Sequence, residues 1–217
     1  MRVIAGTARG MKLKAPRGEA VRPTADRVRE ALFSILSPRV IGAVVVDLFA
    51  GSGAVGIEAL SRGAEACIFV ENEQKHLEIV RDNLKRTGLD GQARLLCRDA
   101  ISALLHLSGE KLQADLIFAD PPYHSDLIPK VLQAVYTHQL LQKEGLLVIE
   151  HASGNTAWAE KYPQRKQKKY GDTRLTLLSW KDLQTAAAEK ESEANCTDNI
   201  EHGGRGGQKA AEEDKLV

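Results

Sequence analysis

The sequence contains little cysteine and few aromatic residues. Its 217 residues include three cysteines, Cys67, Cys97 and Cys196, and aromatic residues make up 5% of the chain. An odd number of widely spaced cysteines fits neither a disulfide framework nor a zinc cluster. Cys67 and Cys97 lie in apolar, strand-like stretches, so we expect both to be small core residues. This pattern favours a protein of the reducing cytoplasm.

Long apolar runs are also missing. Residues 1–10 carry charges and lack the apolar segment that a secretory signal needs. The apolar run Ala43–Val46 is far too short to span a bilayer. His, Cys and carboxylate residues do not occur at the spacing of metal ligands. We therefore expect no membrane association and no bound metal. The length suits one α/β domain with a sizeable core.

Charge is unevenly distributed along the chain. The net charge is +1, but residues 185–217 contain four Lys or Arg and eight Asp or Glu, a net charge of −4. The preceding residues contain 26 basic and 21 acidic residues, a net charge of +5. The last stretch is polar and has almost no apolar periodicity, so we predict a disordered acidic tail over residues 184–217. We expect a folded domain over residues 41–183 and a basic unit over residues 1–40.

The stretch Val44–Gly56, VVVDLFAGSGAVG, has the pattern of a nucleotide-binding turn. Its valines predict a buried parallel strand, and a helix follows the glycines. Glycine lets the backbone approach a ligand closely, and free N–H groups of a helix favour electronegative atoms. Gly51 to Gly56 also satisfy the dinucleotide pattern G-x-G-x-x-G. The carboxylate of Asp47 would repel a pyrophosphate and suits a cationic ligand such as S-adenosylmethionine (SAM). A purely structural glycine turn is the alternative.

Strands and helices alternate after this turn, as in a doubly wound sheet. The sequence predicts strands at residues 66–70, 93–97, 115–119 and 145–150, helices at 74–86, 100–107 and 127–141, and an antiparallel pair at 168–170 and 175–180. Glu71 ends the second strand, where an acidic residue commonly binds ribose hydroxyls. Asp99 follows the third strand and can accept a hydrogen bond from an adenine amine, cap the next helix, or do both.

The fourth strand runs into Asp120-Pro121-Pro122-Tyr123, the most specific signal in the chain. The two prolines have a fixed φ and no N–H, so they form a rigid turn that presents carbonyl oxygens. Hydrogen bonds from a nucleobase amine to Asp120 and to the Pro121 carbonyl would direct the amine lone pair toward a methyl donor. Tyr123 can stack on a base that has left its helix. Either Asp120 or water could take the amine proton.

The first forty residues are the most basic part of the chain. We predict a small hairpin from residues 2–6 and 11–14 and a helix at 25–36 with Thr24 as its N-cap. A solvated basic face and a contact with a polyanion both fit this pattern. A second basic stretch, residues 161–169, is either a further RNA-facing surface or a solvated loop. The residues predicted to bind nucleic acid are Arg2, Arg9, Lys12, Lys14 and Arg22.

These motifs, in this order, resemble the class I SAM-dependent methyltransferases. The stretch Asp47–Gly53, Glu71, the pair Asp99-Ala100 and the turn Asp120–Tyr123 carry the resemblance. Further segments narrow it to the RsmD family of bacterial 16S rRNA guanine-N2 methyltransferases. They are RVIAG from Arg2, RPT from Arg22, RVREALF from Arg27 and YGDTRL from Tyr170, and the similarity covers roughly residues 1–180.

The resemblance implies a Rossmann-like α/β fold with a seven-stranded, mostly parallel sheet, helices on both faces and an N-terminal β-hairpin extension. It implies SAM as the cofactor and, as the partner, 16S rRNA within the small ribosomal subunit or its assembly intermediate. The residues implied at the target base are Asp120, Pro121 and Tyr123. The residues implied around the cofactor are Asp47, Phe49, Gly51, Gly53, Glu71, Asp99, Ala100, Thr24 and Arg27. We expect a cytoplasmic monomer.

Three other functions fit parts of the pattern. A DNA adenine-N6 methyltransferase shares the Asp-Pro-Pro-Tyr turn, but the stretch from Gly91 to Leu183 has no room for a target-recognition region. A nicotinamide-dependent oxidoreductase would use Gly51–Gly56, yet it explains neither Asp47 nor the paired prolines. A non-catalytic RNA-binding module would leave an intact SAM-binding pattern without a role. We assign no catalytic duty to His151, which ends the fifth strand.

Overall fold

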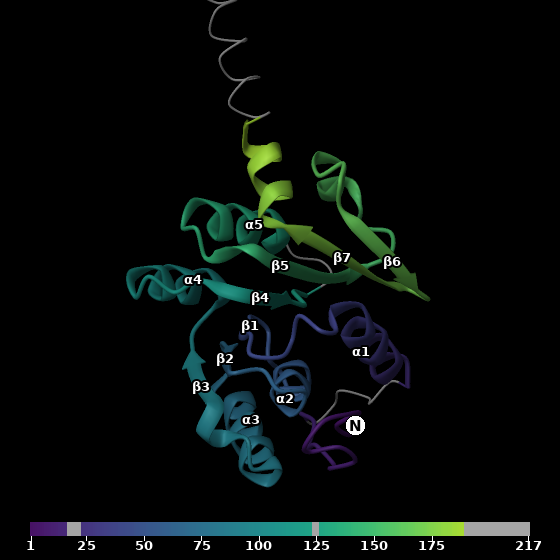
Figure 1. Ribbon diagram of the computed structural model, residues 1–217, viewed down its shortest axis with the longest axis vertical. Helices are drawn as coiled ribbons and strands as arrows, with labels where there is room; N and C mark the ends of the chain where they lie inside the picture. Colours follow the sequence, from purple (N-terminus) through teal and green to yellow (C-terminus); the bar gives the residue numbers. More distant parts are fainter. Residues whose placement is uncertain (17–22, 123–125, 189–217) are drawn as a thin grey trace, which may run out of the picture.

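Figure 1 shows the computed structural model of the chain, which describes residues 1–16, 23–122 and 126–188. Helices and strands alternate through the middle of the chain, as predicted. The helices are α1 (Pro23–Leu36), α2 (Ala54–Ser61), α3 (Gln74–Thr87), α4 (Ala100–Gly109) and α5 (Leu127–Thr137), with 3-10 turns η1 (Asp90–Gln92) and η2 (Ala157–Lys161). The strands are β1 (Val44–Asp47), β2 (Ala66–Glu71), β3 (Ala93–Cys97), β4 (Ala114–Ala119), β5 (Leu141–Ala152), β6 (Lys166–Tyr170) and β7 (Thr173–Ser179).

The strands form one seven-stranded sheet in the order β3-β2-β1-β4-β5-β7-β6. Strands β1 to β5 are parallel, whereas β7 runs antiparallel to both β5 and β6. The strand order reverses between β1 and β4, and open α/β sheets bind ligands at the carboxyl ends of strands at such a point. The predicted Rossmann-like fold is confirmed.

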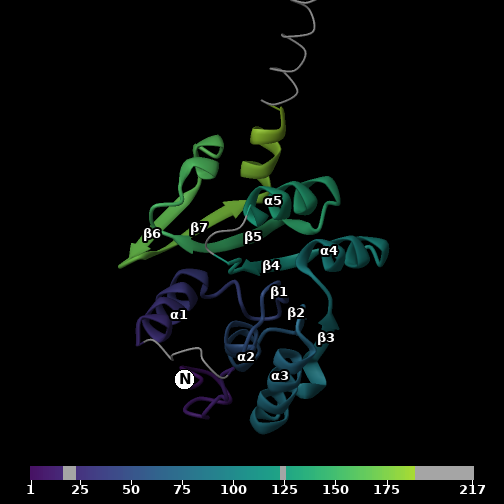
Figure 2. The ribbon, with the colours of Figure 1, turned by 180° about the vertical axis from the view of Figure 1, so that it is seen from behind.

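Helices cover both faces of the sheet (Figures 1 and 2). Helices α1, α2 and α3 pack on one face, and α4 and α5 pack on the other. The first face holds a core that includes Leu32, Ile57 and Leu84, and the second holds one that includes Leu104 and Val131. Because both faces are covered, the central strands are apolar on both sides, which explains the uninterrupted valines of β1.

Residues 1–16, which we call the N-terminal segment, pack on the face of α1, α2 and α3. Val3 and Leu13 are buried in the core of that face. The predicted hairpin is reduced to one antiparallel bridge, between Arg2 and Lys12, with three backbone hydrogen bonds joining its two halves. The backbone N–H groups of Ile4 and Ala5 donate to a side chain of α2, described below. The segment is therefore joined to α2 through its backbone.

Two predictions about individual elements are wrong. The helix predicted to reach residue 141 ends at Thr137, because Gln139 has a φ of 51° and the chain turns there into β5. Cys97 is exposed rather than a core residue, because it ends β3, which is an edge strand of the sheet. Cys67, in the interior strand β2, is buried as predicted.

The chain continues past β7 as a helix over residues 180–188. Leu183 and Ala186 of this helix are buried, so packed structure extends beyond the predicted boundary at residue 183. The rest of the predicted tail, residues 189–217, lies outside the described residues. Within the described part of the chain, none of the helices is long and apolar enough to cross a membrane.

Candidate functional site

A buried carboxylate holds the glycine loop, residues 48–53, between β1 and α2. Asp47, the last residue of β1, is 4% exposed, and its Oδ2 accepts a hydrogen bond from the Gly56 N–H at 3.1 Å. Gly51 and Gly53 have φ angles of 52° and 77°, in the left-handed region that favours glycine. A Cβ on Gly56 would overlap the Phe69 ring. The two glycines of the loop therefore serve its backbone conformation, and Gly56, in α2, allows close packing of α2 on β2.

Glu71, at the end of β2, is a second carboxylate at this loop. Its Oε2 accepts a hydrogen bond from the Gly51 N–H at 2.9 Å, and its Oε1 accepts one from the Glu73 N–H at 3.1 Å. A carboxylate oxygen has two lone pairs, so each retains capacity for a ligand hydroxyl. Phe49 is half-buried in the same loop.

Asp99 caps α4, one of the two roles predicted for it. Its Oδ1 accepts a hydrogen bond from the Ser102 N–H at 3.0 Å, and the hydrogen bonds from Ser102 lower the pKa of Asp99. The side chain is exposed, and Ala100 beside it is buried. Because β3, β2 and β1 are adjacent and parallel, Asp99 lies at the same edge of the sheet as Glu71 and Asp47.

The turn after β4 lies at this edge too. Strand β4 pairs with β1 directly, with Phe118 opposite Asp47. Asp120, two residues further along, is exposed, whereas Pro121 is buried. Tyr123 lies outside the described residues. The structure therefore brings Asp120 and Pro121 to a strand end adjacent to the one that carries the glycine loop.

Sequence reasoning missed Glu150. Ala119 of β4 is opposite Ile149 of β5, so Asp120 and Glu150 are the next neighbours along this edge. Burial, and then the charge of Asp120, raise the pKa of Glu150 to about 8. The missed signal was available in the sequence, because β5 approaches the sheet edge with an acidic residue just as β1 and β2 do.

Carboxyl groups are therefore concentrated at the carboxyl edge of the sheet. Burial raises the pKa of Asp47 to about 7, the hydrogen bond from Gly56 lowers it, and the charges of Asp120 and Glu71 raise it. A bound cation would relieve this repulsion and favour the ionised carboxylates. The edge is suited to a positively charged ligand.

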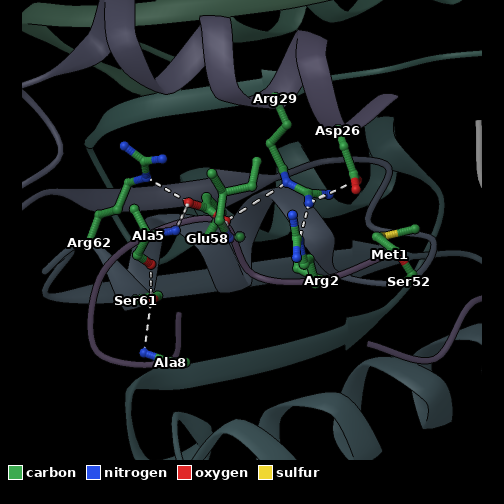
Figure 3. A network of polar contacts seen from close by, with 12 residues as sticks. Met1, Arg2, Ala5, Ala8, Asp26, Arg29, Ser52, Glu58, Ser61 and Arg62 are labelled. Carbon is green, nitrogen blue, oxygen red and sulfur yellow. Dashed lines mark hydrogen bonds and ion pairs between the residues drawn. The ribbon is translucent and has the colours of Figure 1, made fainter. Parts of the chain in front are cut away.

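Glu58 of α2 anchors the N-terminal segment (Figure 3). This carboxylate is 0% exposed, and it accepts hydrogen bonds from the backbone N–H groups of Ile4 and Ala5 at 2.7 and 3.0 Å. Arg29 of α1 is also buried; its Nε lies 3.9 Å from Glu58 Oε2, and its guanidinium donates to the Arg2 carbonyl at 2.6 Å. The network joins the N-terminal segment to both helices.

Asn83 of α3 joins the N-terminal segment to the glycine loop. Its buried Nδ2 donates to the carbonyl oxygens of Ser52 and Lys14, both at 2.9 Å, and its Oδ1 accepts from the Lys14 N–H at 2.8 Å. The basic segment is thus fixed against the loop at which a ligand would bind. Sequence reasoning did not single out Asn83 or Glu58.

Most of the basic residues singled out from the sequence are accessible. Lys14 pairs with Asp82 of α3 at 2.7 Å on the surface. Arg22 and the side chain of Thr24 lie outside the described part of the structure. The exposed residues are Arg2, Arg9, Lys12, Lys14 and, on α1, Arg27.

His151 has a structural environment. Its ring is buried, with Nε2 2.8 Å from Thr176 Oγ1, and it packs edge-on against Trp158. Burial lowers its pKa. Among the residues that the structure describes, no group of His, Cys, Asp and Glu side chains is arranged to hold a metal ion.

Known proteins share this fold and these segments. The family described as "Conserved hypothetical protein 95" matches residues 1–179. The chain belongs to this family. The putative rRNA methyltransferase YlbH of Bacillus subtilis is 42% identical over 70% of this chain and 82% of its own length. The ribosomal RNA small subunit methyltransferase D of Escherichia coli K12 is 36% identical over 69% of this chain and 74% of its own.

A solved structure agrees with the family match. The putative methyltransferase yhhF from Escherichia coli superposes with a TM-score of 0.70 and 33% identity, over 82% of this chain and 96% of that one. The resemblance to the RsmD family and the class I methyltransferase fold are both confirmed. Every site residue described above lies within the range that the family matches.

Proposed function

We propose that this protein transfers a methyl group from SAM to the exocyclic N2 amine of a guanine in 16S rRNA. One observation carries the proposal: the glycine loop with its buried Asp47 and the Asp120-Pro121 turn end two adjacent strands. The relative from Escherichia coli, named as a small-subunit rRNA methyltransferase, supports RNA as the substrate.

The residues of the carboxyl edge fit SAM. When bound, SAM supplies an electrophilic methyl group on a positively charged sulfonium, and the carboxylates of this edge offset that charge. Gly51 has a left-handed φ and no atom within 4 Å of the position of a Cβ, so a ligand can approach its backbone. The residues that would hold SAM are Asp47, Phe49, Gly51, Gly53, Glu71, Asp99 and Ala100, with Thr24 and Arg27 of α1 at the border.

Asp120, Pro121 and Tyr123 act on the target base. The guanine amine is a poor nucleophile because its lone pair is delocalised into the ring. Hydrogen bonds from its two protons to the Asp120 carboxylate and the Pro121 carbonyl localise that lone pair, and stacking on Tyr123 fixes the base. A nitrogen–carbon bond forms as the sulfur–carbon bond breaks, and the surplus amine proton leaves to Asp120 or to water.

The N-terminal segment binds the rRNA around that base. Its exposed basic side chains, with Arg22, are suited to phosphate contacts, and Asn83 and Glu58 hold the segment beside the glycine loop. The substrate is rRNA within the small ribosomal subunit or an assembly intermediate, and the enzyme acts as a monomer in the cytoplasm.

Transfer of tritiated methyl groups from SAM tests this function. The acceptors are naked 16S rRNA, small-subunit particles from cells that lack the enzyme, particles from untreated cells, and genomic DNA. We expect label at guanine N2 in the particles from deficient cells. Label at DNA adenine would instead identify an adenine-N6 methyltransferase, and absence of label with SAM still bound would refute the substrate assignment.

Two variants separate the roles at the base. Asp120→Ala should abolish transfer while the dissociation constant for SAM changes by no more than a few-fold. Tyr123→Ala should raise the KM for RNA more than it weakens SAM binding. Asp90→Ala, at an exposed aspartate of η1, is the matched control. An Asp120→Ala enzyme that still methylates well would remove Asp120 from the mechanism.

A further inference from the structure

Strand β6 is a basic edge of the sheet. It is the last strand in the order, so one side of it has no neighbouring strand. Its sequence is KQKKY, and Lys166, Lys168 and Lys169 are all exposed. Within the described residues, no ion pair involves any of these three lysines. Three cationic side chains thus stand on a short strand without an anionic partner among the described residues.

Two of these lysines share the face of the sheet that carries α1 and the N-terminal segment. Tyr170, at the end of β6, packs against the core of that face. Successive side chains of a strand alternate between faces, so Lys168 and Lys166 lie in the same row as Tyr170, and Lys169 lies on the other face. The row and the basic N-terminal segment therefore lie on the same face of the sheet.

The register of the sheet relates this row to the reacting groups. Lys168 is opposite Leu175 of β7, and Leu175 is opposite Glu150 of β5. Glu150 is the edge neighbour of Asp120. Lys168 and Asp120 are therefore separated by three strand spacings, roughly 14 Å at about 4.8 Å each. In Figure 1, β6 and the N-terminal segment lie on opposite sides of α1, so they flank this end of the sheet.

We infer that Lys166 and Lys168 form a second RNA-binding surface, which contacts backbone phosphates on the side of the target base opposite to the N-terminal segment. The inference rests on the proposed function. When a base is flipped out, the RNA backbone must be held on both sides of it. Two separated basic surfaces can hold the backbone phosphates without recognising a particular sequence. Lysine is suited to such contacts as a point charge.

Edge strands also carry lysine for another reason, because charge on an unpaired edge prevents sheets from joining. Replacing the lysines by neutral residues has a different effect if they bind phosphate than if they protect the sheet edge. Loss of phosphate contacts weakens RNA binding in a salt-dependent manner and leaves the protein monomeric. Loss of edge protection promotes association of the protein and leaves the intrinsic RNA affinity intact.

The test is the double variant Lys166→Gln/Lys168→Gln, in the full chain. Its matched control is Lys111→Gln/Lys143→Gln, which removes two exposed charges that follow α4 and begin β5, at the opposite end of the parallel strands. Binding to a 16S rRNA transcript is measured by fluorescence anisotropy between 50 and 400 mM KCl. SAM affinity, melting temperature and sedimentation are measured on all three proteins.

Each phosphate contact contributes a slope of about 0.7 to 0.9 in log K against log salt, or about fivefold in affinity at 0.1 M. We expect the β6 variant to lose a slope of about 1.5 and about 25-fold in affinity at 0.1 M salt. The control should lose much less of both, and SAM affinity should stay constant. An unchanged slope in a monomeric, folded β6 variant overturns the inference, as does a loss of affinity accompanied by self-association.

The methyl-transfer assay distinguishes failure of this inference from failure of the proposed function. If the unmodified protein labels rRNA and the β6 variant binds it equally well, only the second surface is refuted. If the unmodified protein labels no RNA at all, the proposed function is refuted, and the inference of an RNA-binding surface on β6 is refuted as well.

Discussion

Replacing Glu58 by glutamine tests whether one buried carboxylate fixes the N-terminal segment to the domain. In the structure it accepts the N–H groups of Ile4 and Ala5 and the Nε–H of Arg62, and it lies near the guanidinium of Arg29. Glutamine has nearly the same shape, but only one of its terminal atoms accepts hydrogen bonds. Its amide NH2 would face a donor, Arg62 would lose its anionic partner, and Arg29 would keep only Asp26.

The expected loss follows from these contacts. A hydrogen bond to a charged group contributes about 1.5–3 kcal/mol, and removing one partner of a buried ion pair costs about 3–5 kcal/mol. These contributions overlap, because the same carboxylate makes all of them, so we expect Glu58→Gln to lower the free energy of unfolding by about 3–5 kcal/mol. If the N-terminal segment detaches before the domain unfolds, the free energy of global unfolding falls by less than this. The segment itself then loses all of its protection from hydrogen exchange.

Urea unfolding and hydrogen exchange measure the two effects separately. We expect a lower urea midpoint and loss of protection at the amides of Ile4 and Ala5, while the amides of β1 and β4 stay protected below the transition. Glu65→Gln, at an exposed glutamate just after α2, is the matched control. A variant with unfolding free energy within about 1 kcal/mol of the unmodified protein, and with both amides still protected, would refute the reasoning.

Three further substitutions probe the glycine loop. Burial raises the pKa of Asp47 to about 7. The folded state therefore holds a proton that the unfolded state releases near pH 4, and the free energy of unfolding should fall as the pH rises from about 4 to about 7. Asp47→Asn should flatten that fall in denaturation at pH 5 and pH 7.5; an unchanged pH slope would contradict the assignment. Gly56→Ala should lower the melting temperature by about 2–10 °C through overlap with Phe69, whereas Gly91→Ala, at an open position, should not; equal shifts would count against the packing argument. Asn83→Asp keeps its acceptor and loses both donations, so both SAM and RNA affinity should fall, and a calorimetric titration that finds both unchanged would be evidence against its bridging role.

Local patterns predicted the parts of the site that depend on neighbouring residues. The glycine loop follows from strand, turn and helix signals within about a dozen residues of each other, and Asp99 caps α4 through a partner only three residues away. The alternation of strands and helices also predicted a doubly wound, mostly parallel sheet, because parallel crossovers allow few topologies.

Long-range contacts explain what sequence reasoning missed. Glu58 stands in an apolar helix, where a lone carboxylate is an unusual choice, but its two backbone donors, Ile4 and Ala5, lie more than fifty residues earlier in the chain. Asn83 likewise accepts from Lys14, 69 residues away. The backbone N–H groups of Ile4, Ala5 and Lys14 in the predicted hairpin donate to these two side chains, and local propensities do not report such partners. The exposure of Cys97 depends on β3 being an edge strand, which only the assembled sheet determines.

The docking of the N-terminal segment also bears on how the protein is made. The N-terminal segment is synthesised before its anchoring groups on α2 and α3, which leave the ribosome 54 and 69 residues after their partners in the segment. Contacts of such separation form late, after the loop-closure entropy between them has been overcome. Until α3 emerges, a nascent chain therefore carries an undocked basic segment beside the ribosomal RNA of the particle that synthesises it. Once α3 is complete, the backbone of the segment can dock on the domain, while its basic side chains remain exposed.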